Sequence, residues 1–369
     1  MQRYLAQQVR ADLMRKMVFL AGPRQVGKTT VARSLVGDRP GYMSWDVPAD
    51  REALLRGRLP IAPLLALDEI HKDRAWRALL KGLWDGRVAG QQILVTGSAR
   101  LDFYRHGGDS LQGRYHFLRL HPLSVAELGI TDVEAFRGLL TLGGFPEPFL
   151  GGSETEARRW SREYRVRLAQ EDVRDLERVA DLGRLERLML RLPELVGSPL
   201  SLNALSEDLQ VSHRAVSHWV EILERLYAVF RVPPFGTDAI RAVKKAQKHY
   251  HLDWSLVPEP GARFENLVAA HLLKWVHHEQ DTQGREVELR YVRDVDGREV
   301  DFVLVERGRP LEFIEAKLSA REAPPALRHL KAKFPKAKAT LVVAEGGTPT
   351  RTPDGIETRP AWDYLGSLV

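Results

Sequence analysis

The stretch Gly22-Pro23-Arg24-Gln25-Val26-Gly27-Lys28-Thr29 decides the fold of the first part of the chain. It matches the pattern GxxxxGK[ST], whose glycines let backbone N–H groups approach phosphates closely. An apolar run at 18–20 leads into it, and a helical pattern leads out of it towards Val36. A loop in this setting binds the phosphates of a nucleotide. We expect Lys28 to reach the β- and γ-phosphates and the Thr29 hydroxyl to ligate Mg²⁺. The residues expected to bind ATP are Gly22, Gln25, Val26, Gly27, Lys28, Thr29 and Thr30.

Two carboxylates and a serine are expected to complete this site. The apolar run at 64–67 ends in Asp68-Glu69. Asp68 is expected on the Mg²⁺ side, and Glu69 is expected to orient and deprotonate the attacking water; the alternative for Glu69 is a helix cap. The run at 93–96 ends in Gly97-Ser98, where Ser98 either hydrogen-bonds the water or the γ-phosphate, or only caps the loop. The segment 42–46 is expected to supply a strand between the phosphate loop and Asp68.

Apolar runs alternate with helical patterns over residues 1–126. The runs lie at 17–21, 42–45, 64–67, 93–96 and 115–120. Strands separated by helices predict a mainly parallel sheet with helices on both faces. From residue 125 to 193 the pattern is almost wholly helical and rich in Arg and Glu.

Five segments together resemble one protein family. They are Gly-Pro-Arg-Gln-Val-Gly-Lys-Thr-Thr at 22–30, Leu-Asp-Glu-Ile-His-Lys at 67–72, Thr-Gly-Ser-Ala-Arg at 96–100, Leu-Gln-Gly-Arg at 111–114 and Leu-His-Pro-Leu-Ser at 120–124. The family is the prokaryotic AAA-type ATPases with a C-terminal domain of unknown function, and the resemblance runs from about Tyr4 to at least Ser319. It implies an AAA+ sheet with a central phosphate-loop strand and assembly into a ring or partial ring, such as a hexamer. It also makes Arg114 a candidate arginine finger for a neighbour's site, with Arg100, Arg105 and Arg119 as alternatives.

Composition narrows the class of protein further. At 369 residues the chain is expected to hold roughly two to three domains. The sequence has 0 cysteines, which excludes disulfides, thiolate metal sites and cysteine nucleophiles. No apolar run approaches the ~20 residues that cross a bilayer, and residues 1–10 lack the apolar stretch of a signal peptide. We expect a soluble, cytoplasmic protein with no membrane partner.

The charge balance favours a polyanionic partner. There are 55 Lys and Arg residues against 49 Asp and Glu residues, a net charge of +6. Lys244, Lys245 and Lys248 form one basic cluster with Arg241, and a second cluster contains Lys331, Lys333, Lys336 and Lys338. These clusters either follow DNA phosphates or are solvated helix faces.

Residues 197–240 have the pattern of a helix-turn-helix. Leu202, Leu205 and Leu209 repeat at helical spacing, and Ser212 is expected to cap a second helix. The apolar run at 229–232 is expected to form a wing. His213 and Arg214 would face outward and contact DNA; packing within the chain is the alternative.

The last part of the chain carries a carboxylate followed by Glu-x-Lys. Asp301 begins one predicted strand, and Glu315 and Lys317 share a face of the next. Asp301, Glu315 and Glu265 are expected to hold a divalent cation, with Lys317 activating water or steadying the developing phosphorane charge. This arrangement resembles the restriction-endonuclease superfamily.

We therefore expect an α/β chain in four parts. They are a P-loop AAA+ core with a parallel sheet (1–126), a helical lid or linker (127–196), a winged helix-turn-helix (197–240) and a restriction-endonuclease-like α/β domain (241–369). The expected function is ATP hydrolysis coupled to moving or remodelling DNA, which is branched or single-stranded in one version of this hypothesis. The alternatives are an ATP-controlled switch or scaffold for a protein partner, and an ATP-regulated, metal-dependent nuclease.

Overall fold

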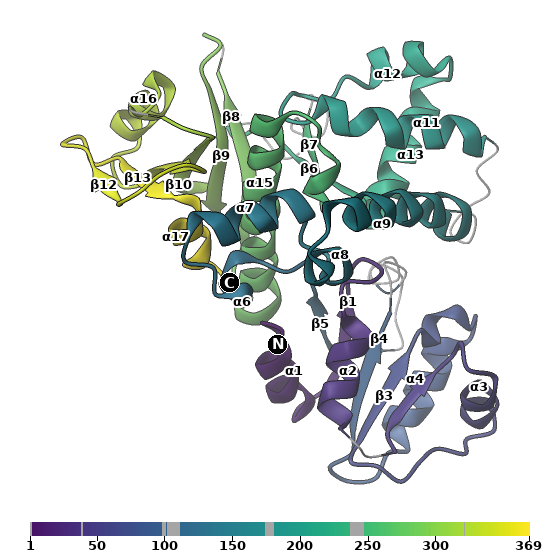
Figure 1. Cartoon of the computed structure of the whole chain (residues 1–369). Helices are drawn as coiled ribbons and strands as arrows, with labels where there is room; N and C mark the ends of the chain where they lie inside the picture. Colours follow the sequence, from purple (N-terminus) through teal and green to yellow (C-terminus); the bar gives the residue numbers. More distant parts are fainter. Residues whose placement is uncertain are drawn as a thin grey trace. The chain divides into compact units, whose positions relative to one another are not determined.

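The computed structural model describes residues 2–37, 40–97, 101, 111–173, 181–236, 247–294, 296–320 and 322–369 (Figure 1). The chain divides into two compact units, an N-terminal unit that ends at His121 and a C-terminal unit that begins at Pro122. Over the described ranges, no helix combines the length and the apolar composition that crossing a membrane requires.

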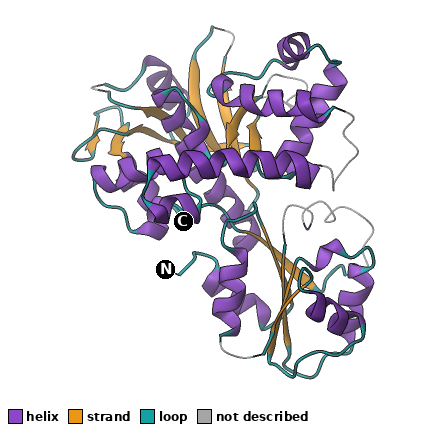
Figure 2. Cartoon of the chain, turned by 45° about the vertical axis from the view of Figure 1, so that its right-hand side comes forward, coloured by secondary structure: helices purple, strands orange, loops and turns teal. Residues whose placement is uncertain are grey.

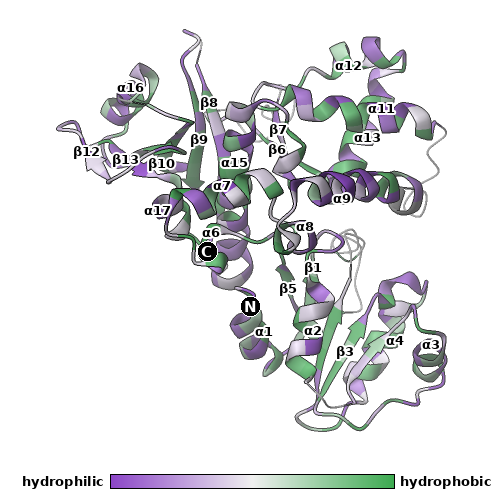
Figure 3. Cartoon of the chain, in the orientation of Figure 1, coloured by the Kyte–Doolittle hydropathy of each residue, from purple (hydrophilic) through white to green (hydrophobic). Residues whose placement is uncertain are grey.

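The N-terminal unit is built on a five-stranded parallel sheet with the order β2-β3-β4-β1-β5. The strands are β1 (Met17–Ala21), β2 (Tyr42–Ser44), β3 (Leu64–Asp68), β4 (Gln92–Thr96) and β5 (Tyr115–Arg119). Each predicted run forms a strand, and the parallel sheet is confirmed. The residues of β3 before Asp68 are apolar, and the ribbon of this strand is coloured as hydrophobic in Figure 3, as expected for a strand covered on both faces.

Helices cover both faces of this sheet, as Figure 2 shows. They are α1 (Ala6–Leu13), α2 (Lys28–Val36), α3 (Pro48–Leu55), a short 3₁₀ helix η1 (Ile70–Lys72) and α4 (Trp76–Asp85). Successive residues of β1 point to opposite faces. Val18 and Leu20 therefore pack in one core with α1 and α2, while Phe19 packs in the other with Trp76 and Leu80 of α4.

The strand that lies beside both β1 and β3 is β4, not β2. Leu94 of β4 is the register partner of Val18 on one side and of Ala66 on the other. Segment 42–46 lies between the phosphate loop and Asp68 in the chain, as expected. In the sheet, however, its strand β2 lies on the far side of β3 from β1, so the expected position in the sheet is wrong. Both strands are short and apolar, so the sequence does not distinguish the edge strand from the central one.

The C-terminal unit contains a six-stranded sheet with the order β12-β13-β11-β10-β9-β8. Helix α15 (Pro260–Gln283) is followed by the antiparallel strands β8 (Val287–Arg293), β9 (Glu299–Glu306) and β10 (Arg309–Lys317). Helix α16 (Pro325–Lys333) then leads to β11 (Lys338–Val343), parallel to β10. Strands β12 (Thr350–Arg351) and β13 (Glu357–Pro360) and helix α17 (Ala361–Gly366) complete it. The predicted order of a helix, three strands, a helix and a strand is the order found.

A helical region occupies the first part of this unit. Its helices are α6 (Val125–Leu128), α7 (Val133–Leu142), α8 (Pro146–Gly151), α9 (Glu154–Arg167), the π-helix η3 (Leu168–Val173), α11 (Leu182–Arg191), the 3₁₀ helix η4 (Leu192–Leu195), α12 (Leu202–Leu209) and α13 (His213–Arg225). Antiparallel strands β6 (Val229–Val232) and β7 (Lys248–His251) follow, and then the 3₁₀ helix η5 (Trp254–Leu256). Ser212 caps α13 as predicted, because its hydroxyl accepts a hydrogen bond from the Ala215 N–H.

Part of the expected lid shares its core with the C-terminal sheet. Val125, Phe136 and Leu139 are buried in the same cluster as Phe264 and Trp254. The rings of Phe136 and Phe264 meet edge to face at 6.1 Å, and the Trp254 indole N–H donates to the Leu139 carbonyl at 3.0 Å. Helices α6 and α7 are thus built into the C-terminal unit, because α7 packs on α15 and η5 and α6 packs on α17.

His271 of α15 makes this packing sensitive to acid. Its Nδ1–H donates to the Leu267 carbonyl at 2.8 Å, while its Nε2 accepts from the Val125 N–H at 3.2 Å, so the ring is neutral. Burial, together with Lys274, lowers the pKa of His271 to about 4, against the opposing effects of the Leu267 carbonyl and Glu127. The unfolded chain takes up this proton first, so stability falls as the pH drops from 6.5 towards 4.

The free energy of unfolding of the C-terminal unit is expected to be about 2 kcal/mol lower at pH 5 than at pH 7 because of His271. Urea unfolding at the two pH values measures this loss. Glutamine does not titrate, so His271→Gln should show a smaller difference between the two pH values. The matched control is His213→Gln, at an exposed position, which should keep the wild-type difference. An unchanged pH dependence in His271→Gln would contradict the assignment.

Candidate functional site

The phosphate loop connects β1 to α2 and depends on two glycines. Gly22 has a φ of +148°, and a Cβ there would lie 2.3 Å from the Leu120 carbonyl oxygen. Gly27 has a φ of 99° and caps α2, which begins at Lys28. Gln25 also adopts a left-handed backbone, with a φ of 58°. The first N–H groups of α2 have no partners within the helix, so they are available to a ligand at this loop.

Lys28 folds back across this loop. Its Nζ donates to the carbonyl oxygens of Gly22 at 3.0 Å and Pro23 at 2.6 Å. Only 6% of the residue is exposed. The loop therefore holds the ammonium group beside the N-terminus of α2, with the positive charge inside the curve of the loop.

Asp68 lies at the end of β3 and collects hydroxyl groups from three elements. Thr29 Oγ1 and the Tyr42 hydroxyl donate to Asp68 Oδ2 at 2.8 and 2.6 Å. Thr96 Oγ1 donates to Asp68 Oδ1 at 2.6 Å. Burial and the bond to Asp68 raise the pKa of Tyr42 to about 12, although Arg33 lies over its ring. Asp68 and Thr29 are brought together as predicted, while Tyr42 and Thr96 were missed.

Glu69 leaves the strand in a left-handed conformation, with a φ of 58°. Its N–H donates to the Thr96 carbonyl at 2.9 Å, and its Oε2 lies 3.7 Å from Lys72 Nζ. Burial raises the pKa of Glu69, while the charges of Lys28 and Lys72 act in the opposite direction. The alternative was that Glu69 caps the helix beginning near Asp73. That helix, α4, begins at Trp76 with Ala75 as its N-cap residue, and the Glu69 side chain makes no capping hydrogen bond to η1 either.

Two further residues hold Glu69 in place. His71 is buried, and its Nε2 lies 3.6 Å from Glu69 Oε2. A Cβ at Gly97 would come within 2.5 Å of His71 Nδ1, so the glycine leaves room for this ring. Lys72 Nζ also contacts Asp46 Oδ2 at 2.6 Å. His71 lies in segment 67–72, which carries the family resemblance, but no role was expected for it, because a histidine two residues after the acidic pair has no fixed role in the sequence pattern.

In the C-terminal unit, Asp301 and Glu315 meet between β9 and β10. The Asp301 N–H donates to Glu315 Oε2 at 3.2 Å, and the Ala316 N–H donates to Asp301 Oδ2 at 3.0 Å. Lys317 Nζ lies 2.7 Å from Glu315 Oε1 and 3.9 Å from Asp301 Oδ2. Burial opposes the charge of Lys317, but Asp301 and Glu315 outweigh it and raise the pKa of Lys317. The predicted carboxylate and Glu-x-Lys set is thus assembled.

The position of Lys248 shows that two predictions were wrong: its own contact with DNA, and the cation site at this cluster. It was expected on a DNA-binding surface, yet its side chain is 1% exposed and its Nζ lies 3.3 Å from Glu265 Oε1. Strand β7 is buried along its whole length, which removes Lys248 from solvent. Within the described ranges, no three His, Asp or Glu side chains are placed to hold a metal ion together. Glu265, Asp301 and Glu315 therefore do not form the predicted cation site in this conformation, because a lysine lies among the acids.

The matches to known proteins follow the chain in three segments. Residues 14–129 match the family model of an AAA domain. The first unit is an AAA-type P-loop domain. Residues 133–259 and 260–364 match two domains of unknown function, DUF8612 and DUF4143. Two uncharacterized proteins, from Mycobacterium bovis and Mycobacterium tuberculosis, are each 24% identical over 346 residues, which covers 88% of this chain and 76% of the relative.

Solved structures give weaker matches. A RuvB variant from Thermotoga maritima is 21% identical, with a TM-score of 0.29, and the match covers 62% of this chain and 86% of that chain. Unliganded Pif1 from Bacteroides sp. is 15% identical, with a TM-score of 0.23, and the match covers 38% of this chain and 45% of that chain. TM-scores this low carry no inference about this protein.

Arg114 lies at the N-terminal ends of the strands of the AAA-type sheet, whereas the phosphate loop lies at their C-terminal ends. It directly precedes β5, which runs parallel to β1 with Met17 beside Tyr115, whereas the loop follows the other end of β1. Its Nε lies 3.3 Å from Asp85 Oδ1. Arg119, at the far end of β5, pairs with Ala21 beside the loop. Arg114 is thus too far along the sheet to reach the phosphate loop of its own chain. Ser98, Arg100 and Arg105 lie outside the described residues.

The expected DNA-contacting residues fall into two groups. His213 and Arg214 are exposed in the first turn of α13, as predicted for an outward-facing helix. Lys244 and Lys245 lie outside the described residues. The lysines near α16 offer a further basic surface, in which Lys333, Lys336 and Lys338 are exposed.

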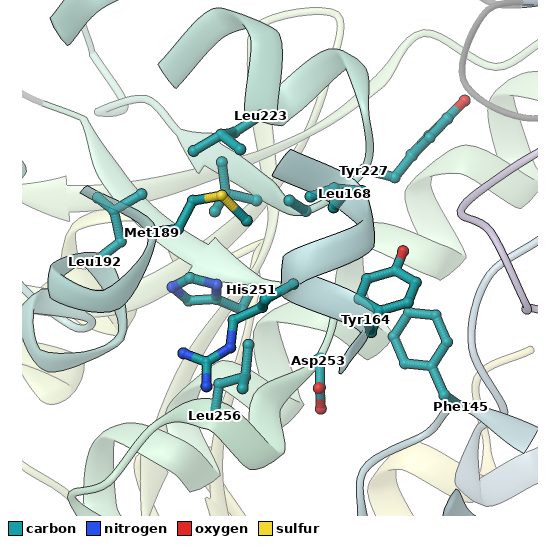
Figure 4. A pocket seen from close by; sticks show the side chains of 13 residues that line it. Phe145, Tyr164, Leu168, Met189, Leu192, Leu223, Tyr227, His251, Asp253 and Leu256 are labelled. Carbon is teal, nitrogen blue, oxygen red and sulfur yellow. The ribbon is translucent and has the colours of Figure 1, made fainter. Parts of the chain in front are cut away.

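A cavity of about 20 Å³ lies in the C-terminal unit among α9, α11, α13 and β7 (Figure 4). Apolar side chains such as Leu168, Met189 and Leu223 line most of it. Burial, with the neighbouring His249, lowers the pKa of His251 to about 3, so this lining histidine is neutral. A volume of this size has room for about one water molecule. The cavity is therefore too small for a nucleotide or a base, and the AAA-type domain remains the candidate nucleotide site.

Proposed function

We propose that this chain hydrolyses ATP in its AAA-type domain and uses the hydrolysis to move or remodel DNA. The observation that supports it best is the convergence of the phosphate loop, Lys28 and Asp68 beside the half-buried Glu69. The loop fits a chain of phosphates, because the positive φ angles of Gly22 and Gly27 turn it around the N-terminus of α2, whose first N–H groups have no partners within the helix. The Thr29 hydroxyl and Asp68, 2.8 Å apart, are the pair that would hold Mg²⁺.

Each residue of the site has a role in this proposal. Lys28 balances the charge of the β- and γ-phosphates, and Mg²⁺, when bound, supplies further neutralisation of that charge. Glu69 accepts a proton from the attacking water, and its raised pKa makes it a stronger base than an exposed glutamate. His71 and Lys72 hold its carboxylate in position. Ser98 remains a candidate for contact with the γ-phosphate.

Assembly is the second part of the proposal. Because Arg114 lies at the opposite end of the strands from its own phosphate loop, it would act only in the site of a neighbouring subunit. We therefore include self-association into a ring or partial ring, with a hexamer as one form of it. Such an ATPase acting on DNA would work in the cytoplasm.

The DNA partner is supported by the charge and by the element order of the C-terminal unit. Helices α11, α12 and α13 followed by the two-stranded sheet β6-β7 have the order of a winged helix, with His213 and Arg214 on its exposed helix. The net charge of +6 favours a polyanion. The helix and strand order from α15 to β11 is compatible with a restriction-endonuclease-like scaffold. We do not propose cleavage, because Lys248 lies among the carboxylates that would bind the metal.

The test is ATP turnover with linear, single-stranded and branched DNA, compared with turnover without DNA. Stimulation by at least one DNA form is expected. Turnover that is indifferent to every DNA form would instead support the alternative, in which ATP controls binding of a protein partner. Scoring strand movement and cleavage in the same reactions separates a motor from a nuclease.

DNA affinity is expected to fall steeply with salt, because lysines that neutralise phosphates release counterions. Replacing Lys333, Lys336 and Lys338 with alanine should reduce the slope of log affinity against log salt by roughly 1 for each phosphate that the protein no longer neutralises. Fluorescence anisotropy over a range of salt concentrations measures this slope.

The matched control removes the same charge from exposed arginines that are already paired with glutamates. Arg158, Arg159 and Arg167 of α9 contact Glu154, Glu156 and Glu163. Their replacement with alanine should change the slope less. Equal slopes in both triple variants would rule out the surface near α16 as the DNA contact.

A further inference from the structure

Lys248 lies inside the acidic cluster of the C-terminal unit. Its Nζ is 2.6 Å from Glu299 Oε1, 3.3 Å from Glu265 Oε1 and 3.7 Å from Asp301 Oδ1. Its side chain is 1% exposed. The carboxylates come from α15 and β9, whereas the lysine comes from β7. The ammonium group therefore stands where these carboxylates would attract a cation from solution.

We propose that Lys248 is a built-in counterion that closes this acidic cluster to divalent cations. The inference is independent of the ATP site and of DNA binding. Mg²⁺ binds oxygen ligands at about 2.0–2.1 Å and needs the same carboxylate oxygens that face the ammonium group. Two cations so close together repel strongly in a buried setting. The cluster can hold the lysine or the metal ion, but not both.

The main chain around Lys248 keeps the ammonium group in this place. Lys248 pairs with Val232 in the β6–β7 ladder and forms a bridge with Pro199. The Leu200 N–H donates to the Gln247 carbonyl at 2.8 Å. On the side of the cluster, Lys248 Nζ lies 5.6 Å from the centre of the Tyr291 ring. The lysine therefore enters the cluster from a strand that is paired on both sides.

Removing the ammonium group would leave an excess of negative charge. Glu265, Glu299 and Asp301 would then face one another. Lys317 would still contact Glu315 and lie 3.9 Å from Asp301 Oδ2, and Arg293 Nε would lie 3.9 Å from Glu299 Oε2. The Tyr250 hydroxyl donates to Glu265 Oε1 at 2.6 Å and would remain as a neutral partner. Burial and Asp301 already raise the pKa of Glu265 to about 7. Carboxylates that lose their nearest counterion in a largely buried cluster either take up protons or bind a metal ion.

The experiment is a Mn²⁺ titration of the full chain without nucleotide, with free Mn²⁺ measured by electron paramagnetic resonance. The wild type is expected to show only a weak background. Lys248→Gln is one atom shorter, keeps a hydrogen-bond donor and loses the charge. It should bind one further Mn²⁺ per chain, at least about ten-fold more tightly than the background. Lys248→Arg, which keeps the charge, should behave as the wild type, and adding Asp301→Asn to Lys248→Gln should remove the new site.

Two results would overturn the proposal. One is a Lys248→Gln protein that has the wild-type circular dichroism spectrum but gains no Mn²⁺ site. The other needs only the wild type and Asp301→Asn: a saturable Mn²⁺ site in the wild type that is abolished in Asp301→Asn would show that the lysine does not exclude the metal. This second comparison decides the matter even where Lys248→Gln fails to fold.

Discussion

Replacing Lys28 with alanine is expected to lower ATP turnover by about 10²- to 10³-fold or more, to the background of the assay. Lys28 is 6% exposed as a residue, and its ammonium group donates to the Gly22 and Pro23 carbonyls within the phosphate loop. Alanine removes the ammonium group that the loop holds beside the N-terminus of α2, where the β- and γ-phosphates are proposed to bind. Phosphate release measured at saturating ATP and Mg²⁺ tests this.

The matched control is Lys81→Ala, which removes an exposed lysine from α4 of the same unit. It should retain wild-type turnover. Lys28→Ala also removes hydrogen bonds that shape the loop, so thermal unfolding of both variants must be compared. Normal turnover by a folded Lys28→Ala protein would rule out the phosphate loop as the ATP site.

The N-terminal sheet could be predicted because its strands carry local signals. Each run is short, apolar and followed by a turn or a helix, and the phosphate loop fixes what lies between β1 and α2. The neighbours of Asp68 could not be predicted in the same way. Tyr42 and Thr96 donate to Asp68 only because β2 and β4 flank β3 in the sheet. Strand order is a tertiary property that alternating apolar runs do not reveal.

The position of Lys248 could not be predicted from the sequence for a different reason. In the sequence it belongs to a basic cluster, and such clusters are usually solvated. In the structure it begins a strand in which every residue is buried. Its burial depends on Glu299 and Glu265, which lie 51 and 17 positions away in the chain. Asp301, Glu315 and Lys317 were placed together correctly, because they lie on consecutive strands of the chain and a spacing of two residues puts Glu315 and Lys317 on one face. A counterion from a third strand leaves no such local pattern.

Replacing Glu69 with glutamine is expected to slow ATP hydrolysis by roughly 10²- to 10⁴-fold while ATP still binds. The amide has nearly the same shape as the carboxylate but cannot accept a proton from water. Lys28 and the Thr29–Asp68 pair are unchanged in this variant, so the groups proposed to hold the phosphates and Mg²⁺ remain. Binding of a fluorescent ATP analogue, measured beside phosphate release, separates the two effects. Glu52→Gln, at an exposed glutamate paired with Arg56 in the same unit, is the matched control and should leave both unchanged.

The pH dependence of turnover distinguishes a catalytic Glu69 from a structural one. Burial raises its pKa above the usual 4.5, against the charges of Lys28 and Lys72. A general base works only when it is deprotonated, so wild-type turnover should fall as the pH drops through this raised pKa. The residual turnover of Glu69→Gln should lack that acid limb, because the variant has no carboxyl group to titrate there. Lys72→Met removes a charge that lowers the pKa of Glu69, so its acid limb should move to higher pH. If the acid limb stays in place in Lys72→Met and persists in Glu69→Gln, another group is the base and Glu69 only supports the fold of the site.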